Sequence, residues 1–209
     1  MPGTSLAGMS KPITCVAGDA TTPLGGGVKV ITHVCNDLGG WGKGFVLALS
    51  RRRPEPEAAH RVWHRQRAHN DFGLGAVQLV QVERYAWVAN LVGQRGIRTG
   101  RSSGVPVRYE AIDTGLAALG DHALRLGASV HMPRIAPSRR SRRCRKGPAT
   151  SDRGTRECRS EERRHRARAT GGERANHRCG LAGGRWERVE PLVRARLADR
   201  GAAVTVYDR

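Results

Sequence analysis

The sequence predicts an α/β fold with a mostly parallel or mixed central sheet, because β-rich runs alternate with segments of helical periodicity along its 209 residues. The run Val28–Val34 is largely apolar on both faces, as expected of a strand that is covered on two sides. Val105–Leu126 has apolar residues at helical spacing and is followed by Gly127, a residue that favours the end of a helix. Together these features predict a single layered domain.

Short β-rich runs bounded by turn residues predict the other strands. The first of them ends at a Gly-Asp corner, and the glycine-rich stretch that follows it is typical of a turn. The runs at 76–82 and 85–92 are separated by a short turn, which predicts a hairpin or a neighbouring pair of strands. These strands are Ile13–Ala17, Ala76–Val82, Tyr85–Val92, Ser129–Met132 and Val204–Tyr207.

Three further helices are predicted from apolar spacing and end signals. The prolines and acidic residues at 54–57 suit a helix N-terminus. Gly201 stops the last helix, which carries Val189, Leu192 and Leu197 at helical spacing. The predicted spans are Phe45–Ser50, Pro54–His69 and Trp186–Arg200.

The positive charge of the chain is concentrated in one segment. Lys and Arg number 37 and Asp and Glu 18, which gives a formal net charge of +19. Residues 136–178 contain 15 of the basic and 5 of the acidic residues, with no aromatic, Leu, Ile or Val residue and no periodicity. Such a segment cannot bury enough apolar surface to offset its chain entropy, so we predict that it is disordered. We also expect residues 1–12, which contain several Gly, Ser and Pro residues, to form a flexible tail.

Composition excludes several classes of protein. No apolar run approaches the roughly 18–20 residues of a membrane helix, and residues 1–11 lack the apolar core of a secretory signal. Five cysteines with no CxxC pair and no export signal indicate free thiols. We therefore expect a cytoplasmic monomer that contacts no membrane and needs no cofactor. A zinc site is not expected either, because no known ligand spacing is matched by Cys144, Cys158, His165, His177 and Cys179.

Two glycine-rich loops each precede a predicted helix. They are Gly39–Gly44, which follows a strand, and Cys179–Gly184. A helix N-terminus presents unpaired backbone N–H groups, and glycine lets the backbone approach a ligand closely, so both positions suit a phosphate. Each loop alone is also compatible with a plain turn. Two such loops before two helices indicate a clamp on two neighbouring phosphates.

The order of these motifs resembles that of a macro domain. Ile13–Thr21 is similar to the first strand and Gly-Asp corner of that family, and His33–Phe45 is similar to its second strand and first phosphate loop. Met132–Ile135, joined to Cys179–Trp186, resembles the fifth strand and second phosphate loop. Val204–Tyr207 resembles the closing strand. The resemblance covers residues 13–135 and 179–208.

The resemblance implies a three-layer α/β/α fold that binds ADP-ribose or an ADP-ribosylated macromolecule. It predicts a macro domain over residues 13–208, interrupted by the basic insertion 136–178. The subgroup most similar to this chain is that of terminal ADP-ribose glycohydrolases and ADP-ribose 1″-phosphate phosphatases.

The resemblance also implies roles for individual residues. Asp19 would accept a hydrogen bond from the adenine amino group, and Asn36 would face the distal ribose. Asp and Asn also commonly form turns, so each of these two residues could instead have only a structural role. The two loops would hold the diphosphate through main-chain donors. The residues implied to bind ADP-ribose are Asp19, Ala20, Asn36, Gly39, Gly40, Trp41, Gly42, Lys43, Gly44, Phe45, Gly93, Gln94, Cys179, Gly180, Leu181, Ala182 and Gly183.

The chain departs from the family in its catalytic residues. The glycohydrolase type uses a lysine just after the fourth strand and an aspartate in the second loop. This chain has Gln94, or its neighbour Arg95, and Ala182 there, and neither Gln94 nor Ala182 can act as nucleophile or acid. Hydrolysis of ADP-ribose 1″-phosphate, O-acetyl-ADP-ribose or terminal protein-linked ADP-ribose would need a positioned water, with Asn36 to orient it and His33 as the nearby base. Binding without turnover is equally consistent.

Three side chains near the first loop have structural alternatives. Trp41 either covers the ligand or packs the loop onto the core. Lys43 either adds charge to a phosphate site or is solvated. His33 shares a strand face with Cys35, and it is either a base or a buried, hydrogen-bonded side chain.

The basic segment interrupts a connection that is short in macro domains. Lengthening a connection about tenfold costs roughly 2 kcal/mol of closure entropy, so we expect the fold to survive, with a less rigid approach to the second loop. Fifteen basic residues would suit contact with nucleic acid. The alternative is an accidental in-frame insertion, which the interspersed acids and the lack of aromatic residues favour.

Overall fold

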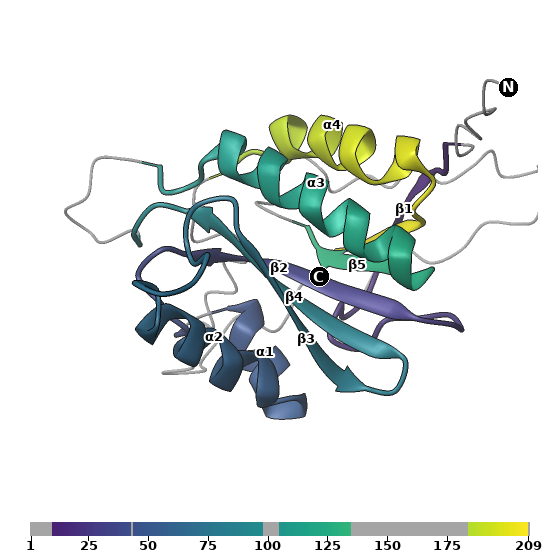
Figure 1. Cartoon of the computed structure of the whole chain (residues 1–209). Coiled ribbons are helices and arrows are strands. Elements are labelled where there is room, and N and C mark those ends of the chain that lie inside the picture. Colours follow the sequence, from purple (N-terminus) through teal and green to yellow (C-terminus); the bar gives the residue numbers. More distant parts are fainter. Residues whose placement is uncertain (1–9, 43, 98–104, 135–183, 209) are drawn as a thin grey trace, which may run out of the picture. The chain divides into compact units, whose positions relative to one another are not determined.

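A computed structural model describes residues 10–42, 44–97, 105–134 and 184–208, and these belong to one compact unit (Figure 1). Six strands form one sheet in the order β1-β6-β5-β2-β4-β3. β1, β6, β5, β2 and β4 pair in parallel, and β3 joins β4 antiparallel at the edge. The strands are β1 Ile13–Ala17, β2 Lys29–Asn36, β3 Val77–Glu83, β4 Ala86–Gln94, β5 Ser129–Pro133 and β6 Val204–Asp208.

Helices lie on both faces of the sheet. Figure 1 shows α3 and α4 on one face and α1 and α2 on the other. The helices are α1 Phe45–Arg52, α2 Glu55–Arg65, α3 Tyr109–Leu126 and α4 Trp186–Arg196, with a short 3-10 helix, η1, at Ala198–Arg200. The predicted α/β/α fold with a mixed sheet is therefore confirmed.

The two layers of helix bury two separate apolar cores. The larger lies under α3 and α4 and includes Val30 of β2, Leu91 of β4 and Ile112 of α3. The smaller lies on the α1 side and includes Ile31, Cys35 and Leu49. Alternate residues of β2 thus enter different cores, which explains why the strand is apolar on both faces.

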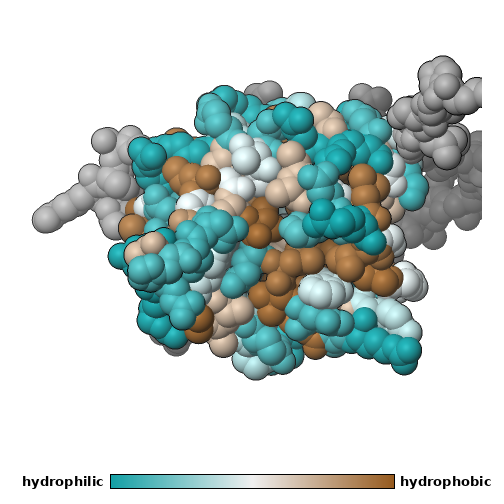
Figure 2. All heavy atoms as spheres, in the orientation of Figure 1, coloured by the Kyte–Doolittle hydropathy of each residue, from teal (hydrophilic) through white to brown (hydrophobic). Residues whose placement is uncertain are grey.

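Apolar side chains also reach the surface beside α3. Figure 2 shows an apolar band across the sheet next to this helix. Val77, Leu79 and Trp87, from β3 and β4, are partly buried against the larger core on the same side. Among the described helices, none has the length and apolar character needed to cross a membrane.

The helices differ from their predicted bounds. α1 continues beyond Ser50 to Arg52, and α2 ends at Arg65 and not near His69, where turns follow it.

The other two helices differ for local reasons. The helix expected from Val105 begins at Tyr109, because Val107 pairs with Gln94 as an isolated β-bridge and Pro106 O accepts a hydrogen bond from Arg95 N at 2.9 Å. The helix expected to reach Arg200 ends as α4 at Arg196 and continues as η1. This tighter turn precedes Gly201, whose φ of 94° lets the chain turn back toward β6.

α3 packs closely against α4 through a glycine. A Cβ atom on Gly120 would lie 2.5 Å from the backbone oxygen of Arg196. Arg196 of α4 forms an ion pair with Asp113 of α3 at 2.6 Å, and Arg200 of η1 forms one with Asp121 of α3 at 2.5 Å. Because the crowded atom is backbone, α4 itself would have to move to admit a side chain here.

We predict that Gly120→Ala destabilises the protein by about 1–3 kcal/mol, although alanine favours a helix over glycine by about 1 kcal/mol. Urea unfolding followed by circular dichroism would measure the loss. A free energy of unfolding equal to or above that of the parent chain would show that α3 and α4 are not packed this closely.

Candidate functional site

The candidate site lies along one edge of the sheet. The parallel strands β1, β2, β4, β5 and β6 all end at this edge, and ligands of open α/β sheets bind outside the carboxyl ends of such strands. Asp19 follows β1, Asn36 ends β2 and Gln94 ends β4. The fold thus brings these three predicted residues to the same edge.

The corner after β1 is a hydrogen-bonded turn. Gly18 N donates to Asp208 O at 2.9 Å, which continues the pairing of β1 with β6. Asp19 Oδ1 accepts from Thr21 N at 3.0 Å, and Asp19 O accepts from Thr22 N at 3.0 Å. Ala20 is buried, whereas Asp19 is half-buried. Asp19 therefore does cap the turn, and its carboxylate stays partly accessible at the edge.

Asn36 organises the first glycine loop. Its Oδ1 accepts from Leu38 N and Gly40 N, both at 3.0 Å, and its Nδ2 donates to Gly40 O at 3.0 Å. Two donors on the oxygen and one acceptor on the nitrogen fix which way the amide points. Among the described residues, the second Nδ2 hydrogen has no further acceptor. Asn36 thus forms the turn and still has one donor for a ligand.

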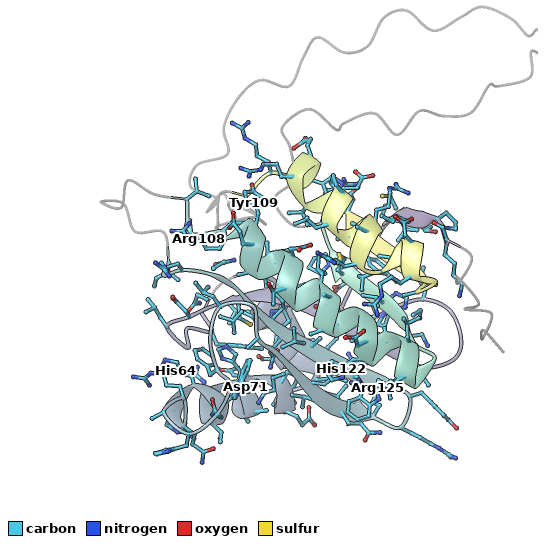
Figure 3. All side chains as sticks on the ribbon, turned by 45° about the horizontal axis from the view of Figure 1, so that its top comes forward. His64, Asp71, Arg108, Tyr109, His122 and Arg125 are labelled. Carbon is cyan, nitrogen blue, oxygen red and sulfur yellow. The ribbon has the colours of Figure 1, made fainter. Side chains whose placement is uncertain are left out.

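Gly39 allows the loop to rest against α2. Its φ is 68°, and a Cβ atom here would lie 2.4 Å from Cγ and Nδ1 of His64. His64 is a residue of α2, and Figure 3 labels its side chain. The sequence gives no separate signal for His64, because the contact depends on how α2 docks under the loop.

Trp41 and Phe45 anchor the rest of the loop to the core. Trp41 is buried and its Nε1 donates to Ser50 Oγ at 2.7 Å, while Ser50 Oγ donates to Glu57 Oε2 at 2.7 Å. Phe45 is half-buried against the same core. Trp41 therefore packs the first loop onto the core, which is one of the two roles expected for it. Gly42 and Gly44 are exposed between these anchors.

The N-terminus of α1 opens toward this loop. No described side chain caps it, and its first turn has no acidic residue. Gly44, at the N-cap, has a φ of 78°, which few other residues adopt. The first-turn N–H groups and the helix dipole make this a suitable position for an anion.

His33 lies below the loop in a closed hydrogen-bond network. Its Nε2 is 2.8 Å from Asn90 Oδ1, and its Nδ1 is 3.6 Å from Cys35 Sγ. Both amide hydrogens of Asn90 are used on Pro56 O and Gln78 Oε1, so the Asn90 oxygen accepts and His33 Nε2 carries the proton.

The ring of His33 is nearly fully buried. Burial lowers the pKa of His33 to about 4, with a smaller contribution from the nearby His60, and burial raises the pKa of the Cys35 thiol. A general-base role for His33 stays a prediction, and both ring nitrogens already have partners within the protein.

The residues after β4 connect the first loop to α3. Asp37 N donates to Gln94 O at 2.9 Å, and Asp37 Oδ1 accepts from Gly96 N at 2.7 Å. A Cβ atom on Gly93 would lie 2.8 Å from Val34 and 2.9 Å from Ile112, so this glycine is required by packing. Gly93 and Gln94 therefore lie at the carboxyl edge of the sheet, where they were expected. The hydrogen bonds of Asp37 with Gln94 and Gly96 were not predicted.

The start of α4 is fixed to the start of α3. Arg185 N donates to Tyr109 Oη at 3.0 Å, and the Arg188 guanidinium lies 3.8 Å from the centre of the Tyr109 ring. Figure 3 shows Arg108 and Tyr109 at this end of α3. On the other side, the Arg134 guanidinium lies 5.0 Å from the ring of Trp186. Gly184, the last residue of the second loop, lies against Val107, which pairs with Gln94 as an isolated β-bridge.

Several predicted residues lie outside the described part of the chain. They are Lys43, Cys179, Gly180, Leu181, Ala182 and Gly183, the segment 136–178, and the cysteines and histidines considered for zinc. Among the described residues, no group of three His, Cys, Asp or Glu side chains could hold a metal ion.

Comparison with known proteins identifies the class. The chain is 51% identical to a macrodomain protein from Streptomyces coelicolor, over 95% of this chain and 99% of that one, with a TM-score of 0.68. A Bacteroides thetaiotaomicron protein of unknown function is 40% identical over 95% and 99% of the two chains, with a TM-score of 0.71. No protein-family model matches the sequence.

Two more distant matches extend the comparison. Thermosipho africanus DarTG, solved in complex with ADP-ribose, has the same fold at 14% identity and a TM-score of 0.51, over 86% of this chain and 38% of that one. Mouse chromodomain-helicase-DNA-binding protein 1-like is 33% identical over 135 residues, which is 60% of this chain and 14% of the mouse protein.

A mixed sheet, parallel except for β3 at its edge, between two helical layers defines an α/β/α class of protein. Within that class, this chain belongs to the macrodomain family.

A buried histidine behind the site gives a test of this packing. His60 of α2 is fully buried among Trp41, Trp63 and Phe72, and neither ring nitrogen has a hydrogen-bond partner in the described structure. Burial, with smaller contributions from the charges of His64 and Arg61, lowers the pKa of His60 to about 4. Protonation therefore favours the unfolded chain.

We predict that the protein loses stability as the pH falls from about 6.5 to 4, because the unfolded chain takes up protons that the buried His60 and His33 do not. His60→Leu should raise stability near pH 7 by about 1–2 kcal/mol by removing two unpaired buried nitrogens, and should reduce the acid dependence. Thermal unfolding between pH 4 and 8 would measure both effects. His69→Leu, at an exposed position, is the control, and an equal gain from both variants would contradict this account.

Proposed function

We propose that the chain binds ADP-ribose, free or attached to a macromolecule, along the carboxyl edge of its sheet. The observation that supports this most directly is the first loop. Asn36 and Gly39 hold it in a defined shape, and it leads into the uncapped N-terminus of α1. A diphosphate would bind there through backbone N–H groups. The Thermosipho africanus DarTG complex supports the identity of the ligand.

In this proposal the ligand lies across three subsites. Asp19 accepts from the adenine amino group, the first loop and the second loop hold the diphosphate, and the remaining Nδ2 hydrogen of Asn36 donates to the distal ribose. The contacts of Tyr109 and Arg134 hold the start of α4, the helix into which the second loop leads.

We further propose that residues 13–208 form one macro domain with residues 136–178 as an insertion. The contact between Arg134 and Trp186 supports this, because it holds the residues on the two sides of the intervening stretch next to each other.

Binding without turnover is the activity that the sequence and the described residues together support best. Gln94 and Ala182 replace the lysine and aspartate of the glycohydrolase type. His33, the only base considered near Asn36, is buried, with its nitrogens engaged by Asn90 and Cys35. We therefore propose a reader of ADP-ribose and expect hydrolysis of its 1″-phosphate, O-acetyl and protein-linked derivatives to be absent.

We predict that calorimetric titration of the full chain with ADP-ribose gives micromolar binding, and that Asn36→Asp weakens it at least tenfold. The new carboxylate keeps the acceptor for Leu38 N and Gly40 N, but it loses the amide donor and repels the diphosphate. Asn70→Asp is the matched control, because Asn70 makes a similar pair of bonds, to Trp63 O and Phe72 N, outside the proposed site.

Absence of ADP-ribose binding by the parent chain would exclude the proposal. Release of phosphate, acetate or ADP-ribose from the corresponding derivatives would show instead that the protein is a hydrolase.

A further inference from the structure

The Asp19 corner is held from behind by Arg53, the residue that follows α1. Arg53 Nη1 donates to Thr21 O at 2.8 Å. Its Nε and Nη2 both donate to Glu83 Oε1, at 2.9 and 2.5 Å. Its own backbone N–H donates to Leu49 O at 2.8 Å. One guanidinium therefore joins the end of α1 and the end of β3 to the turn after β1.

This connection is made in a largely buried position. Thr21 is fully buried, and the Arg53 side chain is only 14% exposed, whereas the Glu83 side chain is 58% exposed. A buried carbonyl oxygen that loses its donor is left desolvated and unpaired, which is unfavourable. The Arg53 bond to Thr21 O therefore stabilises the fold more than the exposed ion pair with Glu83 does. The planar fork of arginine allows both bonds at once.

The held carbonyl belongs to the residue that also binds the Asp19 side chain. Thr21 N donates to Asp19 Oδ1 at 3.0 Å, and Thr21 O accepts from Arg53. The N–H and C=O of Thr21 belong to consecutive peptide groups joined at its Cα, so Arg53 holds the residue whose N–H binds and orients the Asp19 carboxylate. At its other end, α1 begins at the first glycine loop, about 12 Å away for eight residues, so the same helix is tied to both regions.

We propose that Arg53 is a positioning residue for base recognition, and that it directs Asp19 so that the site selects a purine with an exocyclic amino group. This inference rests on the proposed binding of ADP-ribose. Arg53 does not touch the ligand in this scheme. It acts through Thr21 and Asp19.

The test compares ADP-ribose with inosine diphosphate ribose, which has a carbonyl where adenine has its amino group. The ratio of the two dissociation constants isolates the contact with Asp19. For a hydrogen bond to a charged group we expect the parent chain to prefer ADP-ribose by about 10- to 100-fold. We predict that Arg53→Ala reduces this ratio at least fivefold, toward the ratio given by Asp19→Ala. A purely structural loss would weaken both ligands alike and leave the ratio unchanged.

Three further variants complete the experiment. Arg52→Ala, at the exposed neighbouring position of α1, should leave the ratio as in the parent chain. Arg53→Lys keeps the aliphatic chain and the positive charge but lacks the planar guanidinium that makes both bonds, so it should lower the ratio at least threefold. This variant gives a test even if Arg53→Ala fails to fold. The double variant of Arg53→Ala and Asp19→Ala should give no lower ratio than Asp19→Ala alone, because both changes act on one contact.

The outcomes separate the two proposals. If the parent chain binds neither ligand, the proposed function fails. If it binds both equally, or if Arg53→Ala and Arg53→Lys keep the parent ratio, the function stands and the role of Arg53 is excluded.

Discussion

Parallel pairing of five strands is the constraint on which the site depends. Because β1, β6, β5, β2 and β4 run in one direction, the residues that follow β1, β2 and β4 meet at one edge, although they are distant in the sequence. The helices that return the chain between these strands begin at the same edge. The N-terminus of a helix and the C-terminal ends of the strands therefore lie at the same edge as a result of the strand order alone.

The architecture could be predicted because it is encoded in local patterns. The alternation in β2, which sends Val30 and Ile31 into different cores, is visible in the sequence. The macro-domain resemblance also placed Asp19, Asn36 and Gln94 at one edge, as the structure does. The helix that starts at Tyr109 rather than Val105 was missed, because a bridge between Gln94 and Val107 is a long-range contact that no local pattern shows.

The contacts that support the site could not be predicted for the same reason. Arg53 is the third residue of an Arg-Arg-Arg run, and only the fold shows that it alone of the three reaches the turn after β1. His64 is one of several histidines in its region, and its contact with Gly39 depends on the docking of α2. Tertiary packing also determines which polar side chains are buried on the α1 side. His33 is buried with Asn90 as its partner, and His60 is buried with no partner in the described structure, although histidine is a polar residue.

The position of β6 has a consequence for the covalent chain. β6 lies between β1 and β5 and pairs with both, and ion pairs join α4 to Asp113 and η1 to Asp121 of α3. Arg134 and Trp186 touch across the sequence gap between them. A single backbone cut anywhere in 135–183 would therefore not free the C-terminal piece, since it is held by two neighbouring strands and a helix. The two fragments would stay together as a non-covalent complex, so the fold does not require an intact backbone between 135 and 183.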